Sequence, residues 1–378
     1  ANSKLDHAIN IFRINQFNGD LEFMAYEKAD EAINPLMDLE SISHSPDGKY
    51  LYVTSNQYGS LFLFERNLTN GLITLVKEYS AFDEGFESLH ATSDLEISKD
   101  GNHIYISSQE NNSIAVFNRN IANGQLVFVQ EVSNRNLRIN SLNHCIDIQL
   151  SNDNQFLYAL GAEDNALVSF KRNPLSGQLE YLGSIKGVEL QDQMLYPNRL
   201  SISEDDQHLF VCGLRSNSLC VFEIESNSGR PSFAYALSSS DDLPYDLYMP
   251  YTLSYDNANQ LLYVGAIENE SLNLFKVDDG NLQWVQTIFN EDASAKGLAL
   301  ISEILINQAG SDIYTLDQKH DAIAHYRNSL VTNTNHLQDL IDIRIFPNPL
   351  SENLHIGGQV SNDRIDLYSS NGKFISSI

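Results

Sequence analysis

One phrase recurs along this chain at nearly constant spacing. Residues 111–131, "NNSIAVFNRNIANGQLVFVQE", read as a β-hairpin with a glycine in its turn. The aromatic residue that ends the first strand of this hairpin returns every 51 to 53 residues, at Phe12, Phe64, Phe117, Phe170, Phe222, Phe275 and Tyr326. The turn glycines keep the same spacing, from Gly19 to Gly280. Self-similarity at a fixed period of this length is typical of repeat architectures.

A second phrase precedes every hairpin except the first. It lies at residues 42–55, 95–108, 148–161, 200–213, 253–266 and 304–317. Each copy predicts two strands around a turn rich in Asp, Asn and Gly. One repeat is therefore four short antiparallel strands, which is the pattern of a β-propeller blade. The third strand is apolar on both faces, as in "IAVF", and this fits a blade covered on both sides by its neighbours.

The repeat predicts an all-β fold, a β-propeller over residues 1–340. Six full blades can be counted, preceded by one hairpin that carries only third and fourth strands. We expect seven blades, with the first one incomplete in this chain. Its two missing strands are expected upstream of Ala1 or from the C-terminal side.

Composition excludes some classes of function. The formal net charge of −27 disfavours binding to nucleic acid. No apolar run is long enough for a transmembrane segment. The cysteines, Cys145, Cys212 and Cys220, are odd in number, and two buried thiols are favoured over a Cys212–Cys220 bridge, which stays open. Neither a metal-binding spacing nor a P-loop is present, and no cofactor is indicated.

Residues 341–378 break the repeat and predict a small β-sandwich fragment. They hold the turn Pro347-Asn348-Pro349, the strand around Tyr368 and a hairpin turn at Asn371-Gly372. This segment resembles a truncated C-terminal sorting domain of type IX secretion cargo. The resemblance implies the type IX secretion machinery as a partner and a secreted or outer cell-surface location in a Gram-negative bacterium. An ordinary terminal β-sandwich fragment is the alternative.

The blades themselves resemble a family. "SPDGKYLYV" (45–53) and "SIAVFNRNIANGQLVFVQE" (113–131) are similar to the seven-bladed lactonase-type propellers, related to the 6-phosphogluconolactonase superfamily. The resemblance covers nearly the whole of residues 5–337. Its motifs specify strands and turns, so they imply the fold more than any catalysis.

Candidate site residues lie where the first strand of each blade begins. The aligned positions are Ser41, Asp94, Asp147, Arg199, Thr252 and Glu303, with His90 and His144 just before two of the aspartates. We expect them to face a central channel, where an arginine among carboxylates suits an anionic or sugar-like ligand. His–Asp pairing would suit acid–base work. Alternatively, polar residues simply line a wet channel.

Two functions follow. The first is a secreted or cell-surface scaffold that binds a carbohydrate, peptide or small molecule without turnover. The alternative is a lactonase that opens a sugar lactone, with His144, Arg199 and Glu303 converging in the channel. Related lactonases use arginine, glutamate and histidine there, but the full set is not matched. The Pro-Arg-His motif that often precedes strands in such enzymes is absent, and "LYPNRLSIS" (195–203) is the segment most similar to it. A structural module of a longer surface protein also stays open.

Overall fold

The computed structural model describes residues 2–3, 8–28, 36, 38–56, 58–239, 243–290, 297–320, 322–328, 344–347, 366–368 and 374–377. The chain forms two compact units. The first comprises residues 1–9 and 26–237, and the second comprises residues 10–25 and 238–378. No helix in the described residues is long and apolar enough to cross a membrane.

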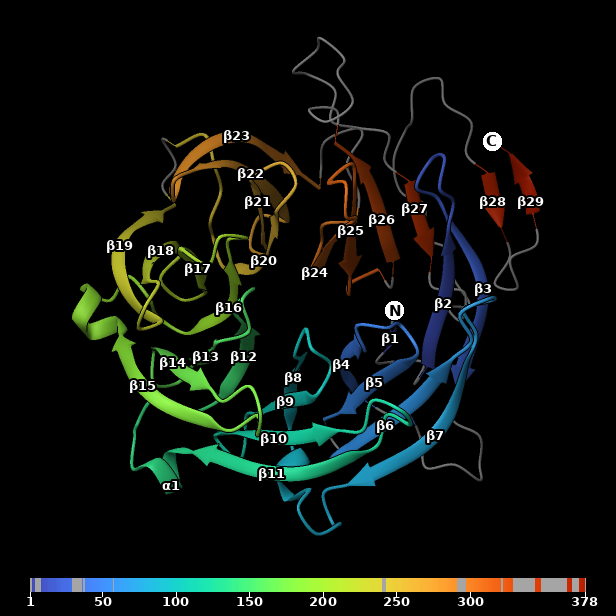
Figure 1. The fold of residues 1–378 in the computed structure, drawn as a ribbon. Helices are drawn as coiled ribbons and strands as arrows, with labels where there is room; N and C mark the ends of the chain where they lie inside the picture. Colours follow the sequence, from blue (N-terminus) through green and yellow to red (C-terminus); the bar gives the residue numbers. More distant parts are fainter. Residues whose placement is uncertain are drawn as a thin grey trace. The chain divides into compact units, whose positions relative to one another are not determined.

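The first unit contains four consecutive four-stranded antiparallel blades, each with its strands in chain order (Figure 1). Their strands are β4 (Leu39–His44), β5 (Tyr50–Ser55), β6 (Ser60–Arg66), β7 (Ile73–Ser80); β8 (Thr92–Ile97), β9 (His103–Ser108), β10 (Ser113–Arg119), β11 (Leu126–Ser133); β12 (Cys145–Leu150), β13 (Phe156–Gly161), β14 (Ala166–Arg172), β15 (Leu179–Lys186); and β16 (Pro197–Ile202), β17 (His208–Gly213), β18 (Ser218–Glu225), β19 (Arg230–Ser238). Three short helical turns, η1 (Glu87–Leu89), α1 (Asn134–Leu137) and η2 (Gly187–Leu190), lie in the loops between blades.

The second unit adds two blades. They are β20 (Pro250–Asp256), β21 (Leu261–Ala266), β22 (Ser271–Asp278), β23 (Asn281–Phe289); and β24 (Ile301–Ile306), β25 (Asp312–Asp317), β26 (Ala322–Arg327), β27 (Arg344–Pro347). The chain begins with a sheet of β1 (Asn2–Ser3), β2 (Ala8–Ile14) and β3 (Leu21–Lys28). The predicted propeller of four-stranded antiparallel blades, six of them complete, is confirmed.

The end of the chain adds detail to the predicted tail. β27 lies beyond residue 340, yet it pairs with β26 as the fourth strand of its blade. A separate hairpin joins β28 (Asp366–Tyr368) to β29 (Phe374–Ser377). Pro347 thus lies in β27 and Tyr368 in β28, whereas Asn348, Pro349 and Gly372 lie outside the described residues. The sorting domain and its boundary at residue 341 stay predictions.

The third strands explain why the blades stack. In β10, the residues Ile114, Ala115, Val116 and Phe117 are all fully buried. Ala115 and Phe117 join one hydrophobic cluster, while Ile114 and Val116 join the next one along the chain. Successive side chains of a strand point to opposite faces, so one strand contributes to two cores. This confirms the interpretation of the apolar third strand.

The repeated turn glycines are needed for contact between blades. Gly124 and Gly177 both have a φ of +73°, which favours glycine, and a Cβ on either would lie within 3 Å of a ring on the preceding blade, Tyr50 or His103. Their carbonyls accept hydrogen bonds from tyrosines of that preceding blade. Tyr52 donates to Gly124 at 2.6 Å, and Tyr105 donates to Gly177 at 2.9 Å.

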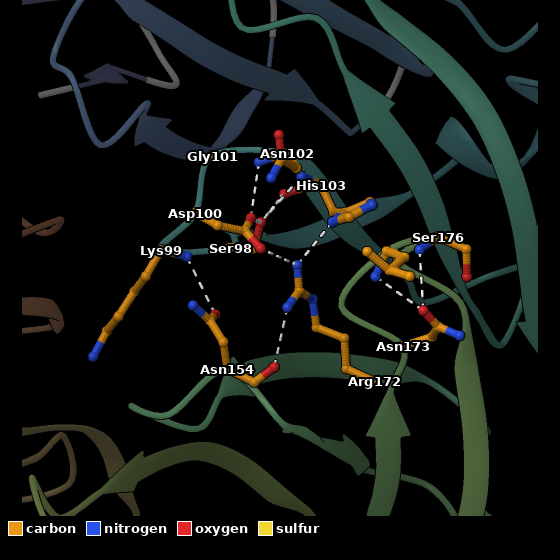
Figure 2. Close-up of polar contacts among 12 residues, drawn as sticks. Ser98, Lys99, Asp100, Gly101, Asn102, His103, Asn154, Arg172, Asn173 and Ser176 are labelled. Carbon is orange, nitrogen blue, oxygen red and sulfur yellow. Dashed lines mark hydrogen bonds and ion pairs between the residues drawn. The ribbon is translucent and has the colours of Figure 1, made fainter.

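A buried arginine ties the second blade of the first unit to the third (Figure 2). We call it the Arg172 network; its members are Ser98, Asp100, His103, Tyr105, Asn154 and Arg172. The guanidinium donates to the Tyr105 hydroxyl at 2.8 Å, to the Asn154 carbonyl at 3.1 Å and to Asp100 at 2.9 Å, and it contacts His103 Nδ1 at 2.8 Å. Arg119 repeats the arrangement one blade earlier, through the Tyr52 hydroxyl at 2.7 Å and the Gly101 carbonyl at 2.9 Å.

Candidate functional site

The first strands of successive blades lie against one another in the first unit, β4 next to β8, β8 next to β12 and β12 next to β16. Each carries a pairing irregularity at the same place, between Thr92 and Leu95 in β8, between Cys145 and Asp147 in β12 and between Pro197 and Arg199 in β16. Bulges of this kind re-aim the side chains beside them. Asp94, Asp147 and Arg199 therefore occupy equivalent, irregular positions, as the sequence alignment predicted.

The two aspartates reach across to the next blade. Asp94 Oδ2 accepts a hydrogen bond from the backbone N–H of Ile148 at 3.3 Å, and its Oδ1 accepts one from Ser41 Oγ at 3.3 Å. Asp147 Oδ2 accepts from the backbone N–H of Leu200 at 2.6 Å. Each carboxylate thus holds the first strand of the following blade, so both have a structural role in addition to any chemistry.

Asp147 and Arg199 form an ion pair with unequal exposure. Arg199 Nη1 lies 3.2 Å from Asp147 Oδ1; the arginine side chain is 25% exposed and the aspartate side chain is 5% exposed. Burial, together with the neighbouring charge of Asp94, raises the pKa of Asp147 to about 8, against the opposing effects of Arg199 and the Leu200 N–H. The partly exposed Arg199 guanidinium is thus held on its buried side by the Asp147 carboxylate.

Glu96 belongs to this group, although the sequence analysis did not select it. It lies two residues after Asp94 in β8, so both side chains are on the same face of the strand. Burial and the charges of Asp94 and Asp147 raise the pKa of Glu96 well above its usual value. The available signal was the alternation itself, a second acid at position i+2.

The two histidines lie in loops before the strands. His90 follows η1, and its ring packs edge-on against Phe82 with the ring centroids 5.9 Å apart. His144 precedes β12 with a φ of 56°, and its backbone N–H donates to Asn112 Oδ1 at 2.7 Å. Neither imidazole bonds to Asp94 or Asp147, because the aspartates are directed at the next blade. The expected His–Asp pairs are not formed.

The remaining predicted positions lie in the second unit. Thr252 is in β20, and Glu303 is in β24, where it pairs with Leu316 beside the same kind of irregularity. The convergence of Glu303 with Arg199 stays a prediction. Among the described residues, no group of three or more His, Cys, Asp or Glu side chains is arranged to hold a metal ion. Cys145, Cys212 and Cys220 are free and buried.

Comparison with known proteins gives a consistent family. Residues 41–184 and 136–242 match the family model described as "Lactonase, 7-bladed beta-propeller". A 6-phosphogluconolactonase of Bacillus subtilis is 30% identical over 147 residues, which is 39% of this chain and 40% of that protein. The chain thus matches less than half the length of this curated relative.

Solved structures agree on the fold. A putative 6-phosphogluconolactonase of Bacteroides uniformis superposes with a TM-score of 0.67 at 14% identity, covering 89% of this chain and 94% of that one. The periplasmic gluconolactonase of Pseudomonas aeruginosa gives a TM-score of 0.65 at 17% identity, with the same coverage of both chains. At such identities, these likenesses support the fold alone.

Proposed function

Because this chain belongs to the lactonase family of seven-bladed β-propellers, we propose that it hydrolyses the cyclic ester of a sugar lactone. The family match carries this proposal. It spans residues 41–242, the part of the chain that holds Asp94, Glu96, Asp147 and Arg199. The curated relative is a 6-phosphogluconolactonase by name, which supports a sugar lactone as the class of substrate.

The expectation of a binding scaffold without turnover is wrong. That expectation treats the repeated sequence motifs of the blades as purely structural, because the catalytic residues of related lactonases are not all matched in this sequence. The family model is instead one of lactonases, and two curated relatives are 6-phosphogluconolactonases by name. The lactonase, given as the alternative, is the better supported function.

Arg199 is the group that we assign to the reacting carbonyl. In lactone hydrolysis, water attacks the carbonyl carbon, negative charge develops on the carbonyl oxygen, and the ring C–O bond then breaks as its oxygen takes up a proton. A guanidinium placed at the developing oxyanion stabilises that transition state. Asp147 acts as a positioning residue, because it fixes the guanidinium from the buried side.

His144 is the residue that we assign to water activation. Its imidazole is half-buried and makes no hydrogen bond or ion pair with any residue that the structure describes. A ring nitrogen of an imidazole can accept the proton of the attacking water and return it to the ring oxygen of the lactone.

The experiment is a lactone assay with a matched arginine control. Purified protein is tested on glucono-δ-lactone and on 6-phosphogluconolactone, with the spontaneous hydrolysis subtracted. Arg199→Gln is expected to lower kcat/KM by about 100-fold or more, the size of effect seen on loss of an oxyanion donor. Arg230→Gln, an exposed position in β19 of the same blade, should leave activity unchanged. Wild-type rates equal to the spontaneous rate on both lactones would refute the function.

We further propose that residues beyond β27 direct export through type IX secretion. The proposal rests on the resemblance of the tail around Pro347–Pro349 and Tyr368 to sorting domains. Because β27 completes a blade, the test removes only residues 348–378. Expressed in a Gram-negative host with that system, the shortened chain should stay inside the cell while the longer chain leaves it. Equal export of both would contradict the proposal.

A further inference from the structure

Three of the repeated turns between third and fourth strands carry the dipeptide Asn-Gly. They are Asn18-Gly19 between β2 and β3, Asn70-Gly71 between β6 and β7, and Asn123-Gly124 between β10 and β11. In such a dipeptide the backbone nitrogen of the glycine can attack the side-chain amide of the asparagine, because glycine has no side chain to obstruct the approach. The three turns therefore form a matched series, in which the effect of the surrounding structure on one reaction can be compared.

The local hydrogen bonding is the same in all three turns. The N–H of each glycine donates to the carbonyl four residues earlier, at 2.8 Å for Gly19, 2.7 Å for Gly71 and 2.7 Å for Gly124. The N–H of the residue after each glycine donates to the asparagine Oδ1, at 3.2 Å, 3.0 Å and 3.0 Å in the same order. This second bond polarises the amide carbonyl that is open to attack. Within the folded chain, a difference in reactivity is then expected from the residues packed around each turn.

Two of the turns are covered by a neighbouring blade. Gly124 is buried, a Cβ on it would lie within 3 Å of a ring, and its carbonyl accepts the Tyr52 hydroxyl at 2.6 Å. In the second unit, Gly19 is buried too, and a Cβ on it would lie within 3 Å of His325. The Tyr314 hydroxyl donates to the Gly19 carbonyl at 2.6 Å. Both glycine peptides are thus held in place from outside their own hairpin.

The third turn is not covered in the described part of the chain. Asn70 is exposed, and a Cβ on Gly71 would meet no described atom within 4 Å. No described side chain donates a hydrogen bond to the Gly71 carbonyl. Closing a five-membered ring between asparagine and glycine rotates the peptide group that joins them and moves the glycine carbonyl. The Asn70 turn can make this movement by itself, whereas a covered turn must first separate from the blade that packs on it.

We propose that Asn70 is a site of spontaneous conversion to isoaspartate, selected from the three by its open turn. The Gly71 backbone nitrogen gives its proton to water and bonds to Asn70 Cγ, while the bond from Cγ to the side-chain nitrogen breaks and ammonia leaves. Water then opens the resulting succinimide at one of its two carbonyls, giving aspartate or isoaspartate. Either product adds a negative charge to the turn, and isoaspartate also places an extra carbon in the backbone.

The modification is independent of the proposed lactonase function. The Asn70 turn follows the end of β6, and antiparallel pairing places it at the end of its blade where β4 finishes at His44. The candidate site instead lies where first strands begin. Because Gly71 has no described neighbour to displace, the lengthened backbone is accommodated in the turn. Modified protein should therefore keep the Tm and the lactone activity of the unmodified protein.

The test follows all three asparagines in one sample. Purified wild-type protein is incubated at mildly alkaline pH, which favours the deprotonated nitrogen, and peptide mapping by liquid chromatography and mass spectrometry separates the asparagine, aspartate and isoaspartate forms. In the folded protein, Asn70 should react at least about 10-fold faster than Asn123 and Asn18. In urea, where no turn is covered, the three rates should converge. Asn70→Ser should remove the fast reaction.

Tyr52→Phe tests the protection directly. It removes the hydroxyl that holds the Gly124 carbonyl, so the rate at Asn123 should rise by about 10-fold while that at Asn70 stays the same. Equal rates at Asn70 and Asn123 in the folded wild type would overturn the proposal. So would a difference that persists in urea, because the flanking sequence rather than the fold would then set the rates. An Asn123 rate unchanged by Tyr52→Phe would also count against protection by the neighbouring blade.

Discussion

Of the Asp–Arg pairs that join neighbouring blades of the first unit, two differ in which partner is buried. In the Arg172 network, Asp100 and Arg172 are 2.9 Å apart, with the arginine side chain 1% exposed and the aspartate side chain 35% exposed. In the candidate site, Asp147 and Arg199 are 3.2 Å apart, with exposures of 5% for the aspartate and 25% for the arginine. The arginine is the buried partner in the first pair and the more exposed partner in the second.

The carboxyl groups respond in opposite directions. Partial burial favours a higher pKa for Asp100, but hydrogen bonds from Ser98, Asn102 and Arg172 outweigh it and lower the pKa to about 2. Deep burial dominates at Asp147 and raises its pKa to about 8. Ion pairing alone therefore does not set the charge of an aspartate here; the balance between desolvation and the number of donors does.

Repetition separates the two roles. Arg119 binds Tyr52 and Gly101 as Arg172 binds Tyr105 and Asn154, so the buried arginine is a device of the scaffold used twice. Within the first unit, the Asp147–Arg199 pair occurs once in the described residues. A device that recurs in successive blades serves assembly, whereas a charge found at only one of several equivalent positions is the better candidate for a ligand.

The largest effect is expected from Arg172→Leu. Removing the guanidinium leaves the buried Tyr105 hydroxyl and the part-buried Asn154 carbonyl with fewer partners, and we expect the free energy of unfolding to fall by about 3 kcal/mol. Urea unfolding measures the change, with Arg230→Leu as the exposed control. Activity per folded molecule should not change. A loss below about 1 kcal/mol would show that the network is not a structural device.

The second prediction concerns pH. Asp147 has a pKa of about 8 in the folded protein against an ordinary value of 3.8, so between about pH 4 and pH 8 the unfolded chain releases a proton that the folded chain retains. Folding stability from this group is complete below pH 4 and declines as pH rises, by up to about 1.4 kcal/mol per pH unit. Asp147→Asn removes the titration, so its Tm relative to wild type should rise from pH 5 to pH 8.

Asp100→Asn is the matched control for that measurement. The Asp100 pKa is lowered to about 2, so its contribution to stability is complete above about pH 4 and is lost only as pH falls toward 2. Between pH 5 and pH 8 this variant should differ from wild type by a constant amount. Parallel Tm curves for Asp147→Asn and wild type over that range would contradict the raised pKa of Asp147.

These comparisons show how far the sequence could be used. The period of the repeat predicted the blades because each strand and turn depends on neighbours in sequence, as in the run from Ile114 to Phe117. The alignment also placed Asp94, Asp147 and Arg199 at equivalent positions. It did not indicate that Arg172 would be buried, since its partners Asp100 and Tyr105 lie about 70 residues away and its own position looks like the start of a turn.

The extent to which each carboxyl group is removed from water could not be predicted from the sequence either. Asp100 and Asp147 are the same residue type in polar surroundings, and their opposite pKa shifts arise from how tightly neighbouring blades close over each one. Glu96 was overlooked because its effect comes from Asp147 on the next blade as well as from Asp94 on its own strand. A pattern within one repeat does not reveal a charge supplied by another.

The smallest effect is expected from Tyr158→Phe, and it tests how much of the scaffold device depends on arginine. Tyr158 donates to the Gly229 carbonyl at 3.1 Å, as Tyr105 does to Gly177, but the position of Arg172 is occupied by Ile224 in the next blade. Phe210 stands at the equivalent place one blade further and has no hydroxyl. We expect a loss of about 1 kcal/mol for Tyr158→Phe in urea unfolding. Tyr105→Phe should cost more, because Arg172 Nε then loses its acceptor in a buried site. Equal losses of unfolding free energy in the two variants would mean that Arg172 adds nothing to the stability of the tyrosine–glycine contact. The contact between blades would then be as stable without the arginine as with it.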